Sequence, residues 1–451
     1  MQRFHAVTAS VFGLLLAGAA VMAGGGIWSQ EASTVQAAPG IYADMLPGLR
    51  TGAVSPAQRR LNTQILNRHL AQGGTLRLRA GSRVEIGGSI RIGSGGAIIG
   101  DTNGARPTIY MAAEAFNNRV DVAGAGRYAP NAVGINFSGE LSGSFRPTQN
   151  VRIEHVALIS EQRPGRRLRG IVGQNVSNCT IKDVEIANFP TAVGIALASA
   201  RGCRLTKVSV HDFSDNTAWD LLAQSTGIEI DNDIVNGRPT SDTLVEGFRI
   251  ARLRMSGPLL KKWGYQTDGI NILGMNSKVD IRDGQISDVG EGIDTFGSGG
   301  TIVDVAIANA DLFGLKFVHG ASRNRAQDIR ITNAGLAAVT FSGSDIAAHD
   351  TVGNVVSGLT VQGVDPTGKW KDNSTAAILV TGVRSRRVPI GNQVVGADID
   401  LGPNGQYAWV DKSTGSRNRG SGLKLKAGRS TVAPTLIESG ATDGVSLVPT
   451  P

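Results

Sequence analysis

A pattern of apolar and polar residues, apolar-x-apolar-x-x-apolar-x-apolar, recurs along most of the chain. It occurs in VRIEHVAL from Val151, in TIKDVEI from Thr180, in RLTKVSV from Arg204 and in IVDVAI from Ile302. Between these segments a glycine precedes a short alternating apolar run, in the segments that begin at Gly134, Gly170, Gly194, Gly227, Gly269, Gly292 and Gly314. Alternation with a period of two predicts short β-strands, and the 3.6-residue stripe of a helical repeat is missing.

These segments recur at a nearly fixed spacing. CTIKDVEIANF from Cys179 aligns without gaps onto CRLTKVSVHDF from Cys203, a shift of 24 residues, and Gly269, Gly292 and Gly314 follow one another after 23 and 22 residues. A single strand would expose an apolar face and two open edges, whereas stacked coils pair the edges and bury a continuous core. The spacing therefore predicts an all-β chain, folded as a single-stranded right-handed parallel β-helix of about a dozen coils.

The N-terminus has the features of an export signal. Gln2 and Arg3 precede an apolar run over residues 11–23, which is short for a membrane span, and VQA at residues 35–37 is a plausible cleavage site. Residues 1–37 are therefore predicted to be a signal peptide, with an uncleaved anchor as the alternative. The mature protein is expected to be secreted or periplasmic, with no stable membrane span after removal of the signal.

The segments on either side of the coils are predicted to differ from them. Residues 38–74 are expected to hold an N-terminal segment and a capping helix that Ser55 and Pro56 begin and a double glycine ends, with Leu61, Ile65 and Leu70 facing inward. The β-helix itself is expected to span residues 75–410. Beyond residue 411 the period dissolves into Ser, Thr, Gly and Pro, so residues 411–451 are expected to form a C-terminal cap or an assembly segment, with a homotrimer left open.

The two cysteines, Cys179 and Cys203, are predicted to lie one coil apart. A Cα separation of about 4.8 Å would allow a disulfide. In parallel strands in register, however, both Cβ atoms point the same way, which would strain that bond. The sequence-based expectation is two stacked thiols in the core.

Composition and charge limit the partners. The chain has 60 glycines among 451 residues and 41% hydrophobic residues, which excludes a collagen-like or disordered chain. The 45 basic residues exceed the 37 acidic ones, giving a net charge of +8 that favours an anionic partner such as a uronic-acid polysaccharide. The basic residues are scattered and are not interleaved with aromatic residues, so nucleic acid is not expected as a partner.

The order of the N-terminal elements resembles a known superfamily. The beginning of the chain is similar to that of pectate-lyase-like β-helix proteins. It consists of a signal, a helix, GGTLRLRAGSRVEIGGSIRI at residues 73–92, IIGD at residues 98–101 and then the coils. The resemblance covers nearly the whole mature chain, although its motifs belong to the fold and not to one activity. It implies a carbohydrate ligand, but the fold alone does not make an enzyme.

Stacking of the coils would bring distant polar residues together, because equivalent residues of neighbouring coils lie about 4.8 Å apart in a column. One predicted column holds Glu229, Asn271, Asp294 and Lys316, and a second holds Thr226, Asp268, Glu291 and Phe313. The candidate catalytic residues are Glu229, Asp268, Glu291, Asp294 and Lys316. Columns of Asp and Asn are also common in stacked turns, so a purely structural role is the alternative.

Three reactions can use this constellation. In β-elimination, Lys316 or Arg323 would be the base, and a cation, possibly calcium, would be held by carboxylates, with Asp231 and Asp233 as metal ligands beside Asp268 and Asp294. In hydrolysis, one carboxyl group donates a proton and another attacks or activates water. Intramolecular glycosyl transfer needs the same two groups, and the sequence cannot separate it from hydrolysis.

The substrate-binding candidates are Trp219, Trp263, Tyr265 and Arg323. The three aromatic rings could stack on sugar faces or could equally pack insertion loops onto the helix. Compared with polygalacturonase-like enzymes, QTDG at residues 266–269 matches the first catalytic element, whereas GEG at 290–292 and FGLK at 313–316 depart from the other two. We therefore predict an exported lyase of an acidic polysaccharide; the alternatives are a glycoside hydrolase, a glycosyl-transferring enzyme or a non-catalytic, adhesin-like glycan-binding protein.

Overall fold

The computed structural model describes residues 40–112, 132–140, 144–161, 168–190, 192–213, 225–232, 238–253, 267–274, 276–370, 374–382, 385–415, 417–426, 435–437 and 442–450. All of them belong to one compact unit, Ala38–Pro451. The predicted signal segment, residues 1–37, lies outside the described residues. Within the described residues, no helix is long and apolar enough to cross a membrane.

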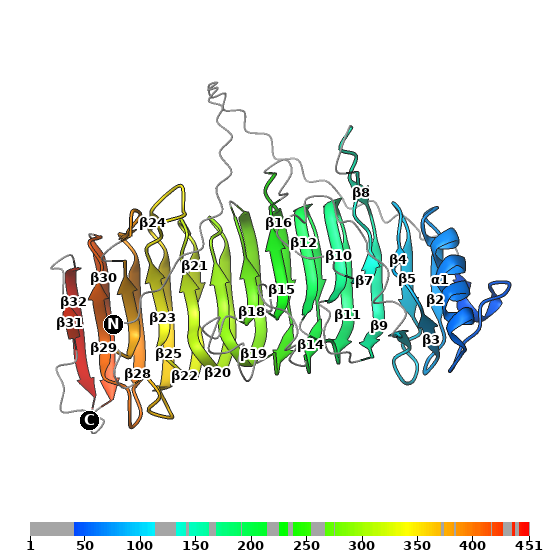
Figure 1. The fold of residues 1–451 in the computed structure, drawn as a ribbon. Helices are drawn as coiled ribbons and strands as arrows, with labels where there is room; N and C mark the ends of the chain where they lie inside the picture. Colours follow the sequence, from blue (N-terminus) through cyan, green and yellow to red (C-terminus); the bar gives the residue numbers. More distant parts are fainter. Residues whose placement is uncertain are drawn as a thin grey trace. The chain divides into compact units, whose positions relative to one another are not determined.

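Rows of parallel strands build successive rungs of a ladder (Figure 1), and two of these rows, which meet at a bend, are described together as the second row. The first row holds β4 (Ile90–Arg91), β7 (Ala132–Asn136), β10 (Leu168–Ser177), β12 (Ala192–Arg201), β15 (Thr226–Asp231), β18 (Asp268–Ile272), β23 (Ala337–Ser342), β26 (Ala376–Thr381), β29 (Tyr407–Lys412) and β31 (Thr435–Ile437). Two long strands, β19 (Ser277–Thr295) and β20 (Thr301–Phe317), take part in both rows.

The second row holds β1 (Ile41–Tyr42), β2 (Thr75–Leu78), β3 (Arg83–Ile86), β5 (Ala97–Gly100), β6 (Thr108–Met111), β9 (Arg152–Ser160), β11 (Thr180–Ala187), β13 (Arg204–Thr206), β14 (Ser209–His211), β16 (Ser241–Glu246), β17 (Arg249–Ala251), β21 (Arg325–Gln327), β22 (Arg330–Ala334), β25 (Val355–Val364), β28 (Gln393–Asp400), β30 (Asn418–Lys426) and β32 (Thr442–Thr450). The short strands β8 (Thr148–Gln149), β24 (Thr351–Val352) and β27 (Pro389–Ile390) lie at turns. The predicted parallel β-helix is confirmed.

The core is a stack of apolar side chains in register from rung to rung. In the first row, Ile228 lies beside Ile270, Ile270 beside Ile293, and Ile293 beside Leu315, and all four are fully buried. The glycine before each of these residues also faces inward. A Cβ on Gly269 would lie 2.6 Å from both the Gly292 carbonyl oxygen and the Ile286 side chain, so no larger residue fits there.

From β9 to β30, one corner of each rung bends through a left-handed residue. In successive rungs this position has a positive φ and is taken by His155, Asp183, Lys207, Gly247, Asp283, Asp304, Asp328, Gly358, Gly396 and Gly422. Asp and Gly tolerate this conformation best, which explains their recurrence between the apolar segments.

Another corner is held by a ladder of buried asparagines. In this ladder each backbone N–H donates a hydrogen bond of 3.1 Å to the side-chain oxygen of the asparagine in the next rung. The successive members are Asn324, Asn354, Asn392 and Asn418. Because Asn418 belongs to β30, the ladder continues past residue 411. The expected change of structure at that point is not seen, since β30 and β32 add further rungs.

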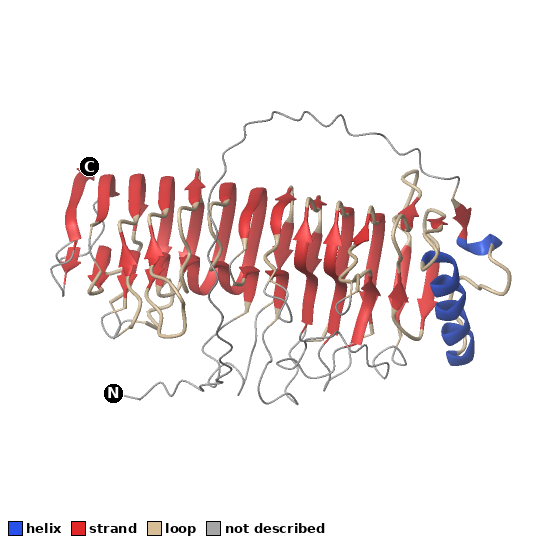
Figure 2. Ribbon diagram, turned by 90° about the horizontal axis from the view of Figure 1, so that it is seen from above, coloured by secondary structure: helices blue, strands red, loops and turns tan. Residues whose placement is uncertain are grey.

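The capping helix α1 (Pro56–Leu70) lies beside β2, β3 and β4 at the N-terminal end of the ladder (Figures 1 and 2). As predicted, Pro56 is its first residue and the Ser55 hydroxyl accepts from the Gln58 N–H at 3.3 Å. A short 3-10 helix, η1 (Ala43–Met45), precedes it. Leu70 is buried, as predicted. Leu61 was also expected to face inward, but it is 40% exposed, and Leu66 is buried instead.

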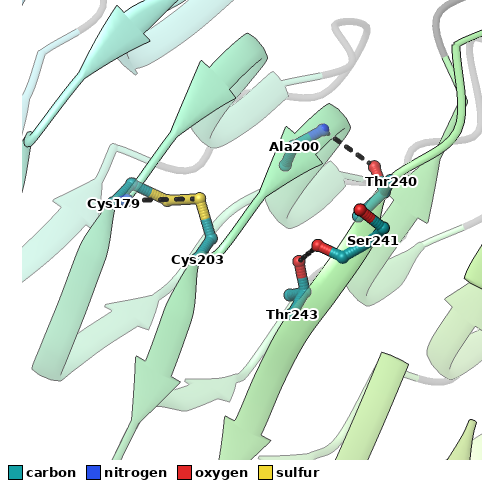
Figure 3. Close-up of a disulfide and its surroundings, with 6 residues drawn as sticks. All are labelled: Cys179, Ala200, Cys203, Thr240, Ser241 and Thr243. Atoms are coloured by element: carbon teal, nitrogen blue, oxygen red, sulfur yellow. Dashed lines mark hydrogen bonds between the residues drawn. A yellow bond between two sulfur atoms is a disulfide. The ribbon is translucent and has the colours of Figure 1, made fainter. Parts of the chain in front are cut away.

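Cys179 and Cys203 form a disulfide (Figure 3), so the prediction of two free thiols is wrong. Each cysteine directly follows a left-handed residue, Asn178 or Gly202, and precedes its strand. The side chains therefore leave from a turn, where their direction is not set by the pleat of paired strands. The Cα atoms are 4.5 Å apart, within the range for a disulfide.

Replacing both cysteines by serine is expected to lower the free energy of unfolding by about 3 kcal/mol, because the bond closes a loop of 24 residues in the unfolded chain. Denaturant unfolding of the variant and the native protein measures the difference. Intact mass without reductant provides the control. A mass that corresponds to two free thiols would contradict the crosslink.

Candidate functional site

The two predicted polar columns exist in the first row of strands. Thr226, Asp268, Glu291 and Phe313 are neighbours in successive rungs, and so are Glu229, Asn271, Asp294 and Lys316. The Gly-apolar pair explains why both columns face the same way. Because Gly269 and Ile270 both point into the core, the residues before and after them, Asp268 and Asn271, both point outward.

Four of these side chains form what we call the acidic cluster: Asp268, Glu291, Asp294 and Lys316. One carboxylate oxygen from each of the three acids lies within 4.8 Å of the other two. The Lys316 ammonium contacts Glu291 Oε2 at 2.9 Å and Asp294 Oδ2 at 3.1 Å. Asn271 donates its amide to Asp268 Oδ2 at 2.7 Å. Three adjacent rungs therefore supply one lysine and three acids to a single site.

Burial controls the protonation of the cluster. Asp268 is 3% exposed and Glu291 1%, and burial raises the pKa of both carboxyl groups. For Asp268 the neighbouring carboxylates of Glu291 and Asp294 raise the pKa further, well above its ordinary value. Burial raises the pKa of Glu291 to about 7, although the ammonium of Lys316 opposes this shift. Burial and the neighbouring carboxylates thus favour the protonated form of Asp268, which lies beside a carboxyl group with a pKa near neutral pH.

The remaining two groups form a strong ion pair. Burial also raises the pKa of Asp294, although Lys316 opposes the shift. Burial disfavours the ammonium of Lys316, yet the carboxylates of Asp294 and Glu291 raise its pKa above the ordinary value. Lys316 is therefore charged at neutral pH.

Several buried oxygen atoms of the cluster have no hydrogen-bond donor. Among the described residues these include Glu291 Oε1, Asp294 Oδ1 and Asn271 Oδ1. In the next rung, Thr340 Oγ1 beside Lys316 also has no partner. A buried polar group without a partner costs about 1–3 kcal/mol, so the site is suited to a ligand that brings hydrogen-bond donors.

Other predicted site residues lie apart from the cluster. Glu229 is two rungs from Asp294 and pairs with Arg169 at 3.1 Å. Asp231 Oδ1 accepts from the Asn232 N–H at 2.7 Å. Arg323 is exposed in the turn after β20, where its backbone N–H donates to the Val352 carbonyl oxygen. The predicted residues Trp219, Asp233, Trp263 and Tyr265 lie outside the described residues.

The aromatic rings beside the cluster differ from the predicted platforms. Phe313 follows Glu291 in its column, is half-buried, and lies with its ring centroid 5.6 Å from the Lys316 ammonium. Phe296 follows Asp294 by two residues and contacts the His319 ring at 4.4 Å between centroids. The predicted second column already held Phe313, whereas the pair of Phe296 and His319 depends on the turn after each strand.

His319, next to Phe296, is held in one protonation state. Ser344 Oγ accepts from the backbone N–H groups of Ile346 and Ala347, so its own hydrogen is donated to His319 Nδ1. Burial, with the charge of Lys316, lowers the pKa of His319 to about 4. The ring is therefore neutral at pH 7 and carries its proton on Nε2.

The cluster fits a divalent cation poorly. Its oxygen atoms are of the type that calcium prefers, and Asp268, Glu291 and Asp294 lie close enough together to share an ion. The Lys316 ammonium, however, already contacts two of these three carboxylates and would repel a second cation. We derive no step through calcium.

Known proteins resemble the chain in fold. A family model described as "Right handed beta helix region" matches residues 169–352. The Streptococcus pneumoniae surface protein and adhesin PfbA is 9% identical, with 91% of this chain and 100% of that chain covered and a TM-score of 0.51. A double mutant of the tailspike protein of E. coli bacteriophage HK620 is 12% identical, with 90% and 80% covered and a TM-score of 0.55.

A further mutant of the same tailspike protein, in complex with a hexasaccharide, is 12% identical, with 90% of this chain and 80% of that chain covered and a TM-score of 0.54. No curated protein matches the sequence. At these identities the solved structures establish the fold alone. The family match over residues 169–352 agrees with the observed fold, the right-handed parallel β-helix that the resemblance of the N-terminal motifs implied.

Proposed function

We propose that the protein is an exported enzyme that acts on a polysaccharide and hydrolyses a glycosidic bond at the acidic cluster. One observation carries the proposal. Asp268, whose pKa is raised well above its ordinary value so that the protonated form is favoured, lies one rung from Glu291, whose pKa of about 7 lets it ionise near neutral pH. Two carboxyl groups with separated pKa values are what glycoside hydrolysis requires.

Asp268 acts as the general acid. Its proton passes to the glycosidic oxygen as the bond from that oxygen to the anomeric carbon breaks. The ionised Glu291 attacks the anomeric carbon, because one oxygen of each carboxyl group lies within 4.8 Å of the other, a closeness typical of retaining enzymes and not of inverting ones. Water then releases the sugar from Glu291, with the carboxylate of Asp268 as the base that takes up a proton again.

Lys316 and Asp294 position the nucleophile. The ammonium holds Glu291 Oε2 at 2.9 Å, which leaves Oε1 without a hydrogen-bond partner in the protein and makes it the attacking atom of the proposal. Phe313, beside Glu291, offers an apolar ring to a sugar face. Because three acids and one lysine line the cluster, the sugar at the cleaved bond is expected to carry no carboxylate, even though the net charge of +8 favours an acidic polymer as a whole.

β-Elimination receives less support from the geometry. As the base, Lys316 would have to be neutral, but its contacts with two carboxylates raise its pKa. An arginine is protonated at any working pH, and Arg323 lies in an exposed turn.

Incubation with a panel of neutral and acidic polysaccharides tests the function. We expect new reducing ends without the ultraviolet absorbance of unsaturated uronides, and proton NMR should show products that retain their anomeric configuration. Unsaturated products would mean elimination. Binding to a glycan without any cleavage would mean a non-catalytic protein.

The pH dependence of kcat/KM tests the assignment of Glu291. The rate should increase as pH rises through about 7, because Glu291 must ionise to attack, and the loss of the proton of Asp268, whose pKa is raised, should set the falling limb. Initial rates across a pH series measure both limbs. The His319→Gln variant is the matched control, because His319 is neutral throughout this range and the rise near pH 7 should remain. A rise near pH 4 instead would contradict the role of Glu291.

A further inference from the structure

A groove with polar and apolar lining residues lies on the second row of strands, on a different row from the acidic cluster. We call it the C-terminal groove. It encloses about 680 Å³, and its floor and walls come from β22, β25, β28 and β30, successive rungs toward the C-terminal end (Figure 1). Its lining comprises Thr332, Asn333, Thr360, Val361, Gln362, Gly363, Asp398, Ile399, Asp400, Gly402, Pro403, Lys424 and Lys426.

The outward side chains of the groove form two columns. Thr360, Asp398 and Lys424 are neighbours in one column, and Thr332, Gln362, Asp400 and Lys426 in the other. Ile331, Leu359 and Val361 fill the alternate, inward positions and are buried, so the polar side chains are directed out of the core. The second column spans three rung steps, or about 14 Å along the axis.

The beginning of the groove offers hydrogen-bonding groups that the protein does not use. Among the described residues, the side chains of Thr332, Thr360 and Gln362 make no hydrogen bond with the protein, and Gln362 is exposed. At the other end, Lys424 pairs with Asp398 at 3.5 Å and Lys426 with Asp400 at 3.1 Å.

These groups define the chemistry of a ligand. Hydroxyl and amide groups both donate and accept hydrogen bonds, as the hydroxyls of a sugar do. The two lysines and two aspartates balance in charge, so the lining gives no advantage to a charged ligand. A ligand that repeats its hydroxyl groups along its length, with a spacing near that of the rungs, meets each rung in an equivalent way.

We propose that the C-terminal groove is a second, non-catalytic binding site for an extended neutral oligosaccharide. The chain lies along the axis, and Thr332, Thr360 and Gln362 bond its hydroxyl groups. This site would hold a polymer on the surface of the protein independently of cleavage at the acidic cluster. The inference does not depend on the proposed hydrolysis, because it predicts binding alone.

Affinity electrophoresis in native gels that contain galactomannan, dextran or xylan tests the proposal. The experiment uses the Asp268→Asn background in every sample, so that cleavage cannot remove the polymer. We expect at least one of these neutral polymers to retard the protein. Thr360→Ala combined with Gln362→Ala should weaken the apparent affinity about tenfold, the effect of losing two or more hydrogen bonds.

Gln285→Ala is the matched control, because Gln285 is an exposed residue in the same column as Thr360, three rungs away from it. It should migrate as the background protein does. The proposal is overturned if no neutral polymer retards the protein, if the double variant binds as tightly as the background, or if Gln285→Ala weakens binding equally. Failure of hydrolysis in the unmodified protein, with binding lost only in the groove variant, would reject the proposed enzyme activity and retain the groove.

Discussion

Asp268→Asn removes hydrolysis and keeps the protein folded. The side chain retains its shape and its contact with Asn271, but it has no acidic proton to give to the leaving oxygen. We expect kcat to fall by about 10²- to 10⁴-fold, the contribution of a positioned general acid. The loss should be smaller with an aryl glycoside, whose leaving group needs little protonation.

Azide separates the roles of the two carboxyl groups. In Asp268→Ala, azide should attack the glycosyl-enzyme intermediate and give a glycosyl azide of retained configuration. In Glu291→Ala, azide should take the place of the nucleophile and give the inverted product. NMR of the products distinguishes the two. Full activity in either alanine variant without azide would remove the cluster from the mechanism.

Lys316→Met destabilises the fold and abolishes activity. The substitution leaves Glu291 and Asp294 buried, each without its ammonium partner, at 1% and 5% exposure. Removal of one partner from a buried ion pair costs about 3–5 kcal/mol, much of it through the charge left behind. Chemical denaturation at pH 7 measures the loss, which should shrink at lower pH as the carboxyl groups take up protons.

The matched control combines Lys316→Met with Glu291→Gln and Asp294→Asn. Because no charge is then left without a partner, this triple variant should recover most of the lost stability while remaining inactive. If Lys316→Met alone were as stable as the native protein at pH 7, the buried ion pair would not have the role we assign to it.

The fold follows from repeated local features of the sequence. The 22- to 24-residue spacing of Gly269, Gly292 and Gly314 reappears as neighbouring rungs, because each glycine faces the core where a Cβ would clash. The same counting placed Asp268 beside Glu291 and Asp294 beside Lys316, since in a stacked fold position in the repeat determines the neighbours. The capping helix was predicted from Ser55 and Pro56 for a similarly local reason.

Features that depend on turns or on contacts across more than one rung were harder to predict from the sequence. The disulfide was missed because the cysteines follow left-handed residues, where the rule for paired strands does not hold. Glu229 was assigned to the acidic face, yet Arg169 from two rungs earlier is its partner. The asparagine ladder through Asn418 continues the rungs where the apolar period fades.

The sequence by itself determined the stacked architecture and which residues share a column, because both depend only on a short repeat and on the direction of side chains in a strand. The tertiary structure alone decided in which direction the pKa of each carboxyl group is shifted, which oxygen atoms lack a partner and where the C-terminal groove lies. Those properties arise from burial and from the distances between side chains of different rungs, and a rung's own sequence contains neither.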